Sequence, residues 1–153
     1  MVQVTLEDPV LRGYFLCSSI LVAKVLFMVY FTGRARFSKK VFINPEDVPL
    51  VKDLFDINDA VCKHDDVDVE RIRSAHLNDL ENIPLFIFIG FIYVLTKPDS
   101  ETALNIFKTY MWSRIIYSIS IALGLPRSLK DQACVISYLL KIYMTLVCMV
   151  KFY

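Results

Sequence analysis

The sequence is poor in the residues that loosen or interrupt a chain. Among its 153 residues only 4 are glycine and 6 are proline, while 56% are hydrophobic and 13% aromatic. This composition excludes disordered, collagen-like and low-complexity proteins. The formal net charge of +1 argues against a nucleic-acid-binding protein, which is usually strongly basic.

Sequence motifs for metal binding, phosphate binding and redox chemistry are also missing. No CxxC pair, zinc-ligand spacing, GxGxxG, P-loop or GxSxG is present. Three of the 4 cysteines lie in apolar stretches, so we expect the cysteines to act as small hydrophobic side chains. The carboxylates at 65–68 belong to a charged connector, and we assign no metal to them.

Charge is distributed very unevenly along the chain. Of the 33 charged residues, 19 lie between positions 34 and 82, and the other 104 residues hold only 14. Apolar stretches that alternate with charged connectors are typical of membrane proteins. A soluble protein would instead show a charged stripe at helical spacing on each surface helix.

Four apolar stretches approach the roughly 20 residues needed to cross a bilayer. We therefore predict an all-α fold, an integral membrane four-helix bundle formed by one domain over residues 1–153. A soluble four-helix bundle with wide apolar faces is the alternative. The predicted spans are about 10–32, 73–96, 103–125 and 132–150, with a charged connector at about 33–70.

The first stretch differs from a cleavable signal peptide, because an acidic segment precedes it and its apolar run is too long. Four spans place the connectors at 33–70 and 125–131 on one side of the membrane. These connectors are richer in Lys and Arg than the opposite side, so we expect them to face the cytosol.

Polar residues at membrane depth are the main candidates for function, because they are costly to bury there. A wall of cations, an amide, a carboxylate and hydroxyls suits a small zwitterionic ligand with several negative charges. The candidates are Arg73, Asn78 and Glu81 in the second stretch and Arg114, Tyr117 and Ser118 in the third.

The same side chains could instead pair with one another and hold the helices together, and Arg114 with Glu81 is one such pairing. The chemistry alone leaves both readings open. His76 fits a packing role better than that of a base. Lys24 could snorkel or pair inside the bundle, and we assign it no chemistry.

Two segments resemble a known family. The segment 70–82, ERIRSAHLNDLEN, and the segment 39–47, KKVFINPED, are similar to signatures of the MAPEG family, the membrane-associated proteins in eicosanoid and glutathione metabolism. Within that family they look like the microsomal glutathione S-transferase and microsomal prostaglandin E synthase subgroup. The resemblance covers nearly the whole chain, and Leu77 resembles the transferases, because the synthases usually carry Arg there.

The resemblance implies a homotrimer in the endoplasmic reticulum membrane, with the outer mitochondrial membrane as an alternative location. Glutathione would bind between subunits near the cytosolic side. Asp47 matches an acidic residue implicated in the synthase reaction. The positions that match the family's glutathione site are Arg36, Arg73, His76, Asn78, Asp79, Glu81, Arg114, Tyr117 and Ser118.

The chain departs from the family pattern on the side that would activate the thiol. The family has an arginine at the start of the fourth span, sixteen residues after the position of Arg114. Lys130 stands there, and Arg127 three residues earlier is a possible substitute. Ile121 replaces a tyrosine, and Tyr117 replaces a histidine.

The expected function is a membrane-bound glutathione transferase, with glutathione-dependent peroxidase activity as a further expectation. The thiolate of glutathione would be stabilised by two cations, Arg114 together with Lys130 or Arg127. A hydroxyl from Ser118 or Ser128 would assist them. That thiolate would attack a hydrophobic electrophile or lipid hydroperoxide. An isomerase of the prostaglandin E synthase type, and a glutathione-binding membrane protein with weakened catalysis, are the alternatives.

Overall fold

The computed structural model describes residues 7–63 and 66–153. The acidic N-terminal residues 1–6 and the connector residues 64–65, which include Asp65, lie outside the described residues. The described residues form five helices and two short strands. These are α1 (Pro9–Lys39), β1 (Val41–Phe42), α2 (Asp47–Phe55), β2 (Val61–Cys62), α3 (Val67–Leu95), α4 (Ser100–Ala122) and α5 (Arg127–Phe152).

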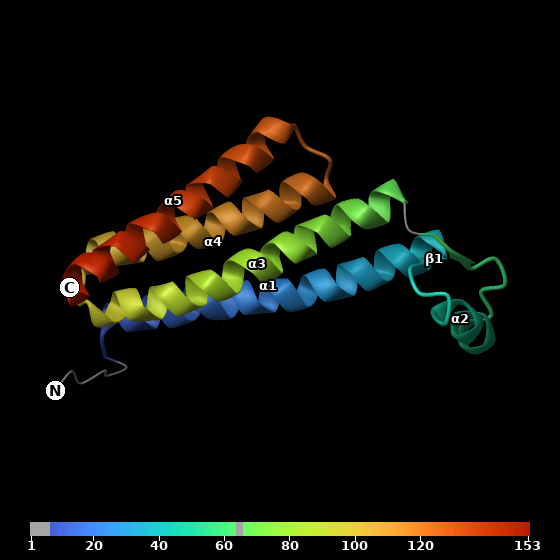
Figure 1. The fold of residues 1–153 in the computed structure, drawn as a ribbon, viewed down its shortest axis with the longest axis horizontal. Helices are drawn as coiled ribbons and strands as arrows, with labels where there is room; N and C mark the ends of the chain where they lie inside the picture. Colours follow the sequence, from blue (N-terminus) through green and yellow to red (C-terminus); the bar gives the residue numbers. More distant parts are fainter. Residues whose placement is uncertain (1–6, 64–65) are drawn as a thin grey trace.

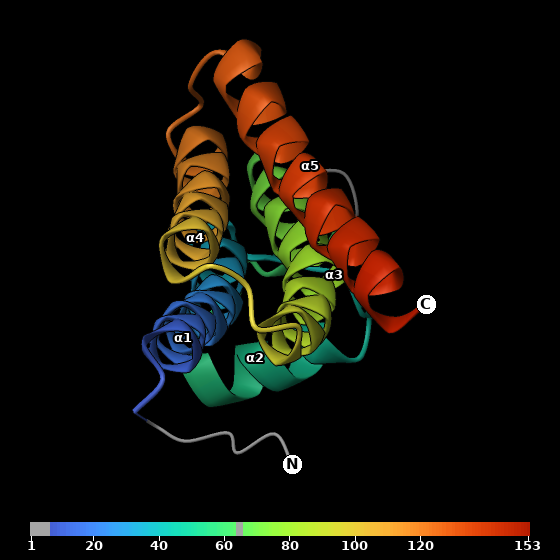
Figure 2. The same ribbon diagram turned by 90° about the vertical axis from the view of Figure 1, so that its left-hand side faces the viewer.

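The four longer helices lie side by side and alternate in direction along the chain (Figure 1). The start of α1, the α3–α4 loop and the end of α5 lie at one end of the molecule. The connector with α2 and the α4–α5 loop lie at the opposite end. The end-on view shows α1 beside α4 and α3 beside α5, with α2 below them (Figure 2). Both connectors, which hold more Lys and Arg than the loops at the other end, therefore share one end, as the sequence predicted.

Helix boundaries follow capping residues rather than the limits of the apolar stretches. Asp8 accepts a hydrogen bond from the Val10 amide at 2.9 Å, and Pro9 begins α1 with a φ suited to a first helical residue. Asp66 and Asp99 cap α3 and α4 in the same way. Lys40 ends α1 in the left-handed region at φ 56°. The helices consequently extend past the predicted spans into polar sequence.

Three helices, α1, α3 and α5, are long and apolar enough to cross a membrane. Helix α4 is not among them; it has 23 residues and includes Glu101, Lys108 and Arg114. The prediction of a helical fold with membrane-length helices is confirmed for α1, α3 and α5. Large apolar side chains cover the outer surface, including Leu26, Phe27 and Phe88. An exterior of this kind suits contact with lipid or another apolar surface.

The core at the end away from the connector is largely aromatic. The rings of Phe86 and Tyr110 stack with centroids 3.9 Å apart. Tyr14 packs edge-on against Phe107, and its hydroxyl donates to the Ile87 carbonyl at 2.6 Å. Cys17 and Cys148 are buried in this core as small side chains, as expected. The cluster fixes α1, α3 and α4 against one another.

The connector contains structure that the sequence analysis did not predict. The two-residue strands β1 and β2 pair in parallel, with Val41 opposite Val61. Helix α2 packs through Val51 against Phe42. Cys62 in this connector is exposed, unlike the expectation for the cysteines as a group.

Candidate functional site

The carboxylate of Asp79 is the centre of a buried polar network in the middle of the bundle. The Arg114 Nη2 atom donates to Asp79 Oδ1 at 2.6 Å, and the Lys24 Nζ atom donates to Oδ2 at 2.5 Å. The Ser118 hydroxyl also donates to Oδ2, at 3.1 Å. One acidic side chain from α3 therefore binds α1 and α4 together.

Helical spacing explains why these groups meet. Arg114 and Ser118 lie four residues apart and so project from the same face of α4. Asp79 lies on the side of α3 that carries the buried residues Ala75 and Phe86. The exposed fraction of both Asp79 and Arg114 is 0%. A charge at this depth is tolerated because it is paired and hydrogen bonded.

Arg114 has donors to spare. Its Nη2 atom also donates to the Asn78 Oδ1 atom at 2.7 Å, and its guanidinium lies 4.6 Å from the centre of the Tyr117 ring. Its Nε and Nη1 atoms are buried and have no hydrogen-bond partner among the described residues. An unpaired buried donor is unfavourable, so these two atoms mark a place where an acceptor would bind well.

A second polar layer lies about one helical turn further along α3. Lys141 on α5 donates to the Asn82 Oδ1 atom. The Tyr110 hydroxyl donates to the Asn82 carbonyl at 2.9 Å, and the Asn82 amide donates to the Asn78 carbonyl at 2.8 Å. The two layers together connect α1, α3, α4 and α5.

Some predicted site residues lie on the opposite face of α3. Glu81 is exposed, and Arg73 pairs with Glu70 at 3.1 Å on the same outward side. The suggested pairing of Arg114 with Glu81 is therefore wrong, because Arg114 binds Asp79 instead. Residues two positions apart on a helix point in nearly opposite directions, so Asp79 and Glu81 cannot share a partner. His76 is half-buried, with its Nε2 atom unpaired within the described residues.

The remaining predicted residues lie toward the connector end and outside the Asp79 network. Arg36 is half-buried near the end of α1. Asp47 begins α2 and accepts a hydrogen bond from the Asn44 amide at 3.1 Å. Arg127 is the first residue of α5, is 86% exposed and pairs with Asp131 at 3.4 Å. Lys130 is half-buried one turn later and forms no ion pair with any described residue.

The structure therefore brings together Asn78, Asp79, Arg114, Tyr117 and Ser118, and it adds Lys24, to which no chemistry was assigned. Asn82 and Lys141 were missed entirely. The sequence did contain a signal for Lys24 and Lys141, because each is the only charged residue within a long apolar stretch. Periodicity could not say which partner each would choose.

A cavity of about 620 Å³ opens beside this network, between α1, α3 and α4. Lys24 and Ser118 lie at its edge, and its other walls are apolar, including Phe27, Met28 and Ile119. A space of this volume accommodates a small organic molecule. The arrangement places an apolar compartment directly against the buried charges.

Comparison with known proteins agrees with these features. Residues 14–150 match the MAPEG family. Microsomal glutathione S-transferase 1 from Rattus norvegicus is 36% identical over 135 residues, 87% of this chain and 84% of that protein. The human protein of that name is 34% identical over 142 residues, 90% and 89% of the two chains. Human prostaglandin E synthase is 34% identical over 118 residues, 77% and 74% of the two chains.

Proposed function

Because the chain belongs to the MAPEG family, we propose that it is a membrane-bound glutathione transferase. Glutathione is its co-substrate, and the second substrate is a hydrophobic electrophile or a lipid hydroperoxide. A detoxifying role follows from this chemistry. The observation that carries the proposal is Arg114, a fully buried cation with two donor atoms that have no partner among the described residues. Through Asp79 it is joined to Lys24 and Ser118, which line an apolar cavity.

In this proposal the Asp79 network holds Arg114 in place for glutathione. Asp79 and Asn78 both accept from Nη2, which leaves Nε and Nη1 free to bind a carboxylate or the thiolate. The Ser118 hydroxyl already donates its hydrogen bond to Asp79, so we assign it the role of orienting that carboxylate. Tyr117 supports the guanidinium through its ring.

The outward polar residues of α3 support a site shared between subunits of a homotrimer. Arg73 and Glu81 lie on the side of α3 turned away from its own bundle. Charged side chains on a membrane helix are costly when they face lipid, so a neighbouring copy is the favourable partner. We assign Arg73, His76 and Glu81, with Arg36, to glutathione contacts at this boundary.

The first turn of α5 is the proposed place of thiolate stabilisation. Pro126 precedes it without providing a side-chain cap, so the first amides of the helix remain available to an anion. Arg127 stands at the first position and Ser128 follows it. Since α5 begins at Arg127, we assign the family's arginine role to this residue and give Lys130 a secondary electrostatic role. A thiol with a pKa near about 8.5 needs such help at neutral pH.

All four long helices cross the membrane in this proposal, including α4, whose charged Arg114 is neutralised inside the bundle. The chain is one domain, with its connector on the cytosolic side and the endoplasmic reticulum as its location. Imaging of a tagged chain against reticulum and outer mitochondrial membrane markers tests the location. Cross-linking of the purified protein in detergent tests the trimer.

A prostaglandin E synthase type of isomerase is the second candidate, favoured by the relatives of that name and by Asp47. Leu77 argues against the isomerase, because the synthases usually carry Arg at this position. Leu77 is exposed and lies between Arg73 and Glu81 on the outward side of α3. A glutathione-binding membrane protein with weakened catalysis is the third candidate.

The decisive experiment measures conjugation of glutathione to chlorodinitrobenzene by the purified full chain in detergent, together with glutathione affinity by calorimetry. Arg114→Ala is compared with Arg12→Ala, an exposed arginine at the start of α1. We expect turnover above the uncatalysed rate for the unaltered protein. Glutathione affinity should fall at least about tenfold in Arg114→Ala and remain unchanged in Arg12→Ala.

The outcomes separate the candidates. Glutathione binding as tight in Arg114→Ala as in the unaltered protein would refute the site. Binding without turnover would favour the weakened protein, and conversion of prostaglandin H to prostaglandin E without conjugation would favour the isomerase.

A further inference from the structure

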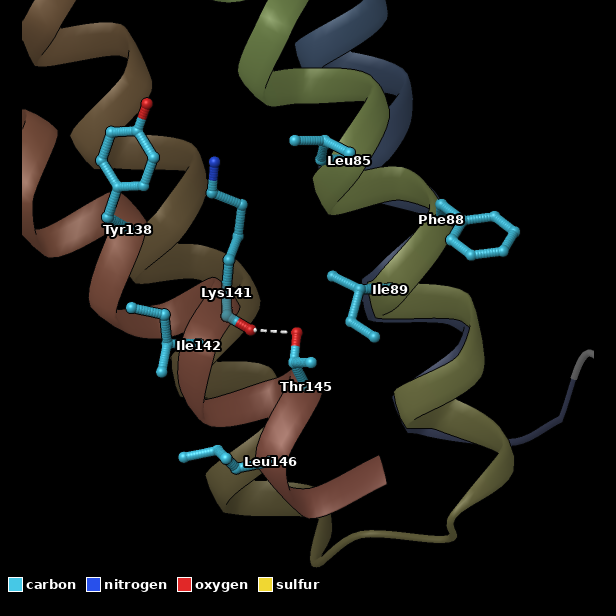
Figure 3. Close-up of a pocket in the computed structure, with 8 residues that line it drawn as sticks. All are labelled: Leu85, Phe88, Ile89, Tyr138, Lys141, Ile142, Thr145 and Leu146. Carbon is cyan, nitrogen blue, oxygen red and sulfur yellow. Dashed lines mark hydrogen bonds between the residues drawn. The ribbon is translucent and has the colours of Figure 1, made fainter. Parts of the chain in front are cut away.

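Three lysines lie well inside the long helices, at least two turns from either end, and two of them have partners in the bundle. Lys24 pairs with Asp79. Lys141 donates to Asn82, and Figure 3 shows its ammonium in the space between α3 and α5. Lys108 on α4 is exposed and forms no ion pair with any residue that the structure describes. A bare cation is costly at membrane depth, so an anion from the surroundings is its favourable partner.

Lys108 lies on the stripe of α4 that leads into the cavity between α1, α3 and α4. Ile115 and Ile119 line this cavity. They follow Lys108 by seven and eleven residues, which are two and three turns of helix. In the opposite direction, α1 and α4 touch one turn before Lys108, where a Cβ atom on Gly13 would lie 2.1 Å from the Leu104 Cδ2 atom. Lys108 therefore stands between this contact and the cavity, in the half of the bundle away from the connector.

The cavity itself is apolar and open to the outside of the bundle. Phe27 on α1 and Ile119 on α4 line it and are 63% and 47% exposed. Its two polar side chains, Lys24 and Ser118, already bind within the Asp79 network, so they offer little to a polar ligand. Along α1 the lining extends over residues 20–31, a helical rise of about 16 Å. An open apolar space of this length at membrane depth suits a hydrocarbon chain.

We propose that the side of the bundle between α1 and α4 binds an anionic phospholipid, with its phosphate paired to Lys108 and one acyl chain in the cavity. Lys108 lies eight residues after Ser100, the first residue of α4, about 12 Å from that end. Its side chain leans toward the start of α4 and can extend further, so the ammonium reaches the headgroups of the leaflet away from the connector. The site rests on the membrane position of α4 in the proposed function and not on transferase activity.

Charge favours a lipid over a second copy of the chain as the occupant. Glu81 is the exposed carboxylate that lies deepest in the described helices, and it stands 14 residues before the end of α3, about 21 Å from that end. The end of α3 and the start of α4 share one end of the bundle (Figure 1). A neighbouring Glu81 would therefore lie about 9 Å deeper than Lys108, whereas a lipid phosphate enters from the headgroup side.

Trp112 reports on this site, because it is the single tryptophan of the chain, lies one turn after Lys108 and is 57% exposed. The full chain is placed in phosphatidylcholine bilayers that contain brominated phosphatidylglycerol or brominated phosphatidylcholine with the same acyl chains, which quench tryptophan on contact. We expect the anionic lipid to bind at least about threefold more tightly. Lys108→Met should remove this preference, and Lys108→Arg should keep it. Lys151→Met, which alters an exposed lysine at the same end of the bundle on α5, should leave it unchanged.

A second pair of variants separates a built site from the general attraction of a lysine for anionic lipid, and it serves if Lys108→Met does not fold. Ala23→Phe fills part of the cavity and leaves Lys108 in place, so the preference should be lost. Val22→Phe, which alters the neighbouring exposed residue outside the lining, should keep it. An undiminished preference in Lys108→Met or in Ala23→Phe would overturn the proposal. Equal quenching by both lipids in the unaltered protein would overturn the lipid site alone, because α4 would still be in the bilayer. Quenching by neither lipid would contradict the membrane position of this face as well.

Discussion

Arg114 on α4 and Asp79 on α3 form an ion pair of 2.6 Å in which neither side chain is exposed. Lys24 on α1 binds the other oxygen of the same carboxylate. The stability of the bundle and the position of Arg114 therefore depend on one acidic residue.

Asp79→Asn should destabilise the protein strongly. The change leaves Lys24 and Arg114 buried without a counter-charge, and removing one member of a buried pair costs about 3–5 kcal/mol. Thermal unfolding in detergent measures the loss. Asp59→Asn is the control, because Asp59 pairs with Lys40 on the surface and should matter little. Equal melting temperatures for Asp79→Asn and the unaltered protein would show that the carboxylate is not the centre of the network.

Gly90→Ala should also destabilise the protein, whereas Gly33→Ala should stabilise it. A Cβ atom at Gly90 would lie 2.9 Å from the Tyr14 ring, whose hydroxyl is held by the Ile87 carbonyl. Overpacking of this kind costs about 1–3 kcal/mol. Nothing lies within 4 Å of the corresponding position at Gly33, so alanine there gains about 0.5–1 kcal/mol of helix preference. Melting temperatures that shift in the same direction would contradict the close approach of α1 and α3.

The role assigned to Arg127 predicts a difference between neighbouring variants. Arg127→Met should lower kcat for glutathione conjugation at least about tenfold, because the thiolate loses one of the cations proposed to stabilise it. Lys130→Met should have a smaller effect, and Lys130→Arg should give no gain. Stopped-flow measurement of thiolate absorbance reports the same step directly. A large gain in Lys130→Arg would move the thiolate stabiliser to position 130.

The cap of α4 predicts a pH dependence of stability. The Thr102 amide and hydroxyl bind Asp99 and hold the pKa of its carboxyl below the ordinary value of 3.8. A lowered folded-state pKa gives stability that is present above pH 3.8 and is lost as the pH falls through the folded value. Asp99→Ala should therefore lower the melting temperature at pH 7, and the difference should shrink in acid. Asp99→Asn, which still caps the helix, should show less of both effects. A difference that is independent of pH would show that the ionised carboxylate is not responsible.

The sequence predicted the four long helices well, because apolar stretches of this length with few charges rarely form any other secondary structure. It misplaced their ends, because Asp8, Asp66 and Lys40 set the boundaries through hydrogen bonds and backbone conformation. Helix α2 and the two-residue strands are too short to leave a periodic pattern. The hydrogen-bond and ion-pair partners of the polar residues were harder to predict than the helix ends. Arg114 could reach either face of α3 in a sequence argument, and only packing showed that Asp79, not Glu81, faces it.

The assignments of Arg36, Asp47 and His76 come from the family resemblance, and their contacts within this chain do not require a ligand role. Asn82 and Lys141 show the opposite case. Their contact across α3 and α5 is clear in the fold, but Lys141 stands in no recognisable motif, and Asn82, the last residue of the segment 70–82, was given no role there. Residues that pair across 59 positions of sequence leave no local spacing to detect.

The shared carboxylate of Asp79 also determines the axial alignment of the helices. Apolar surfaces in a lipid environment provide little resistance to sliding, because neighbouring positions along a helix offer similar contacts. A shift of α1 or α4 by one turn, about 5.4 Å, would separate Lys24 or Arg114 from its partner and leave a bare charge in the interior. The polar layer therefore gives one register to a bundle that packing alone would leave free to slide.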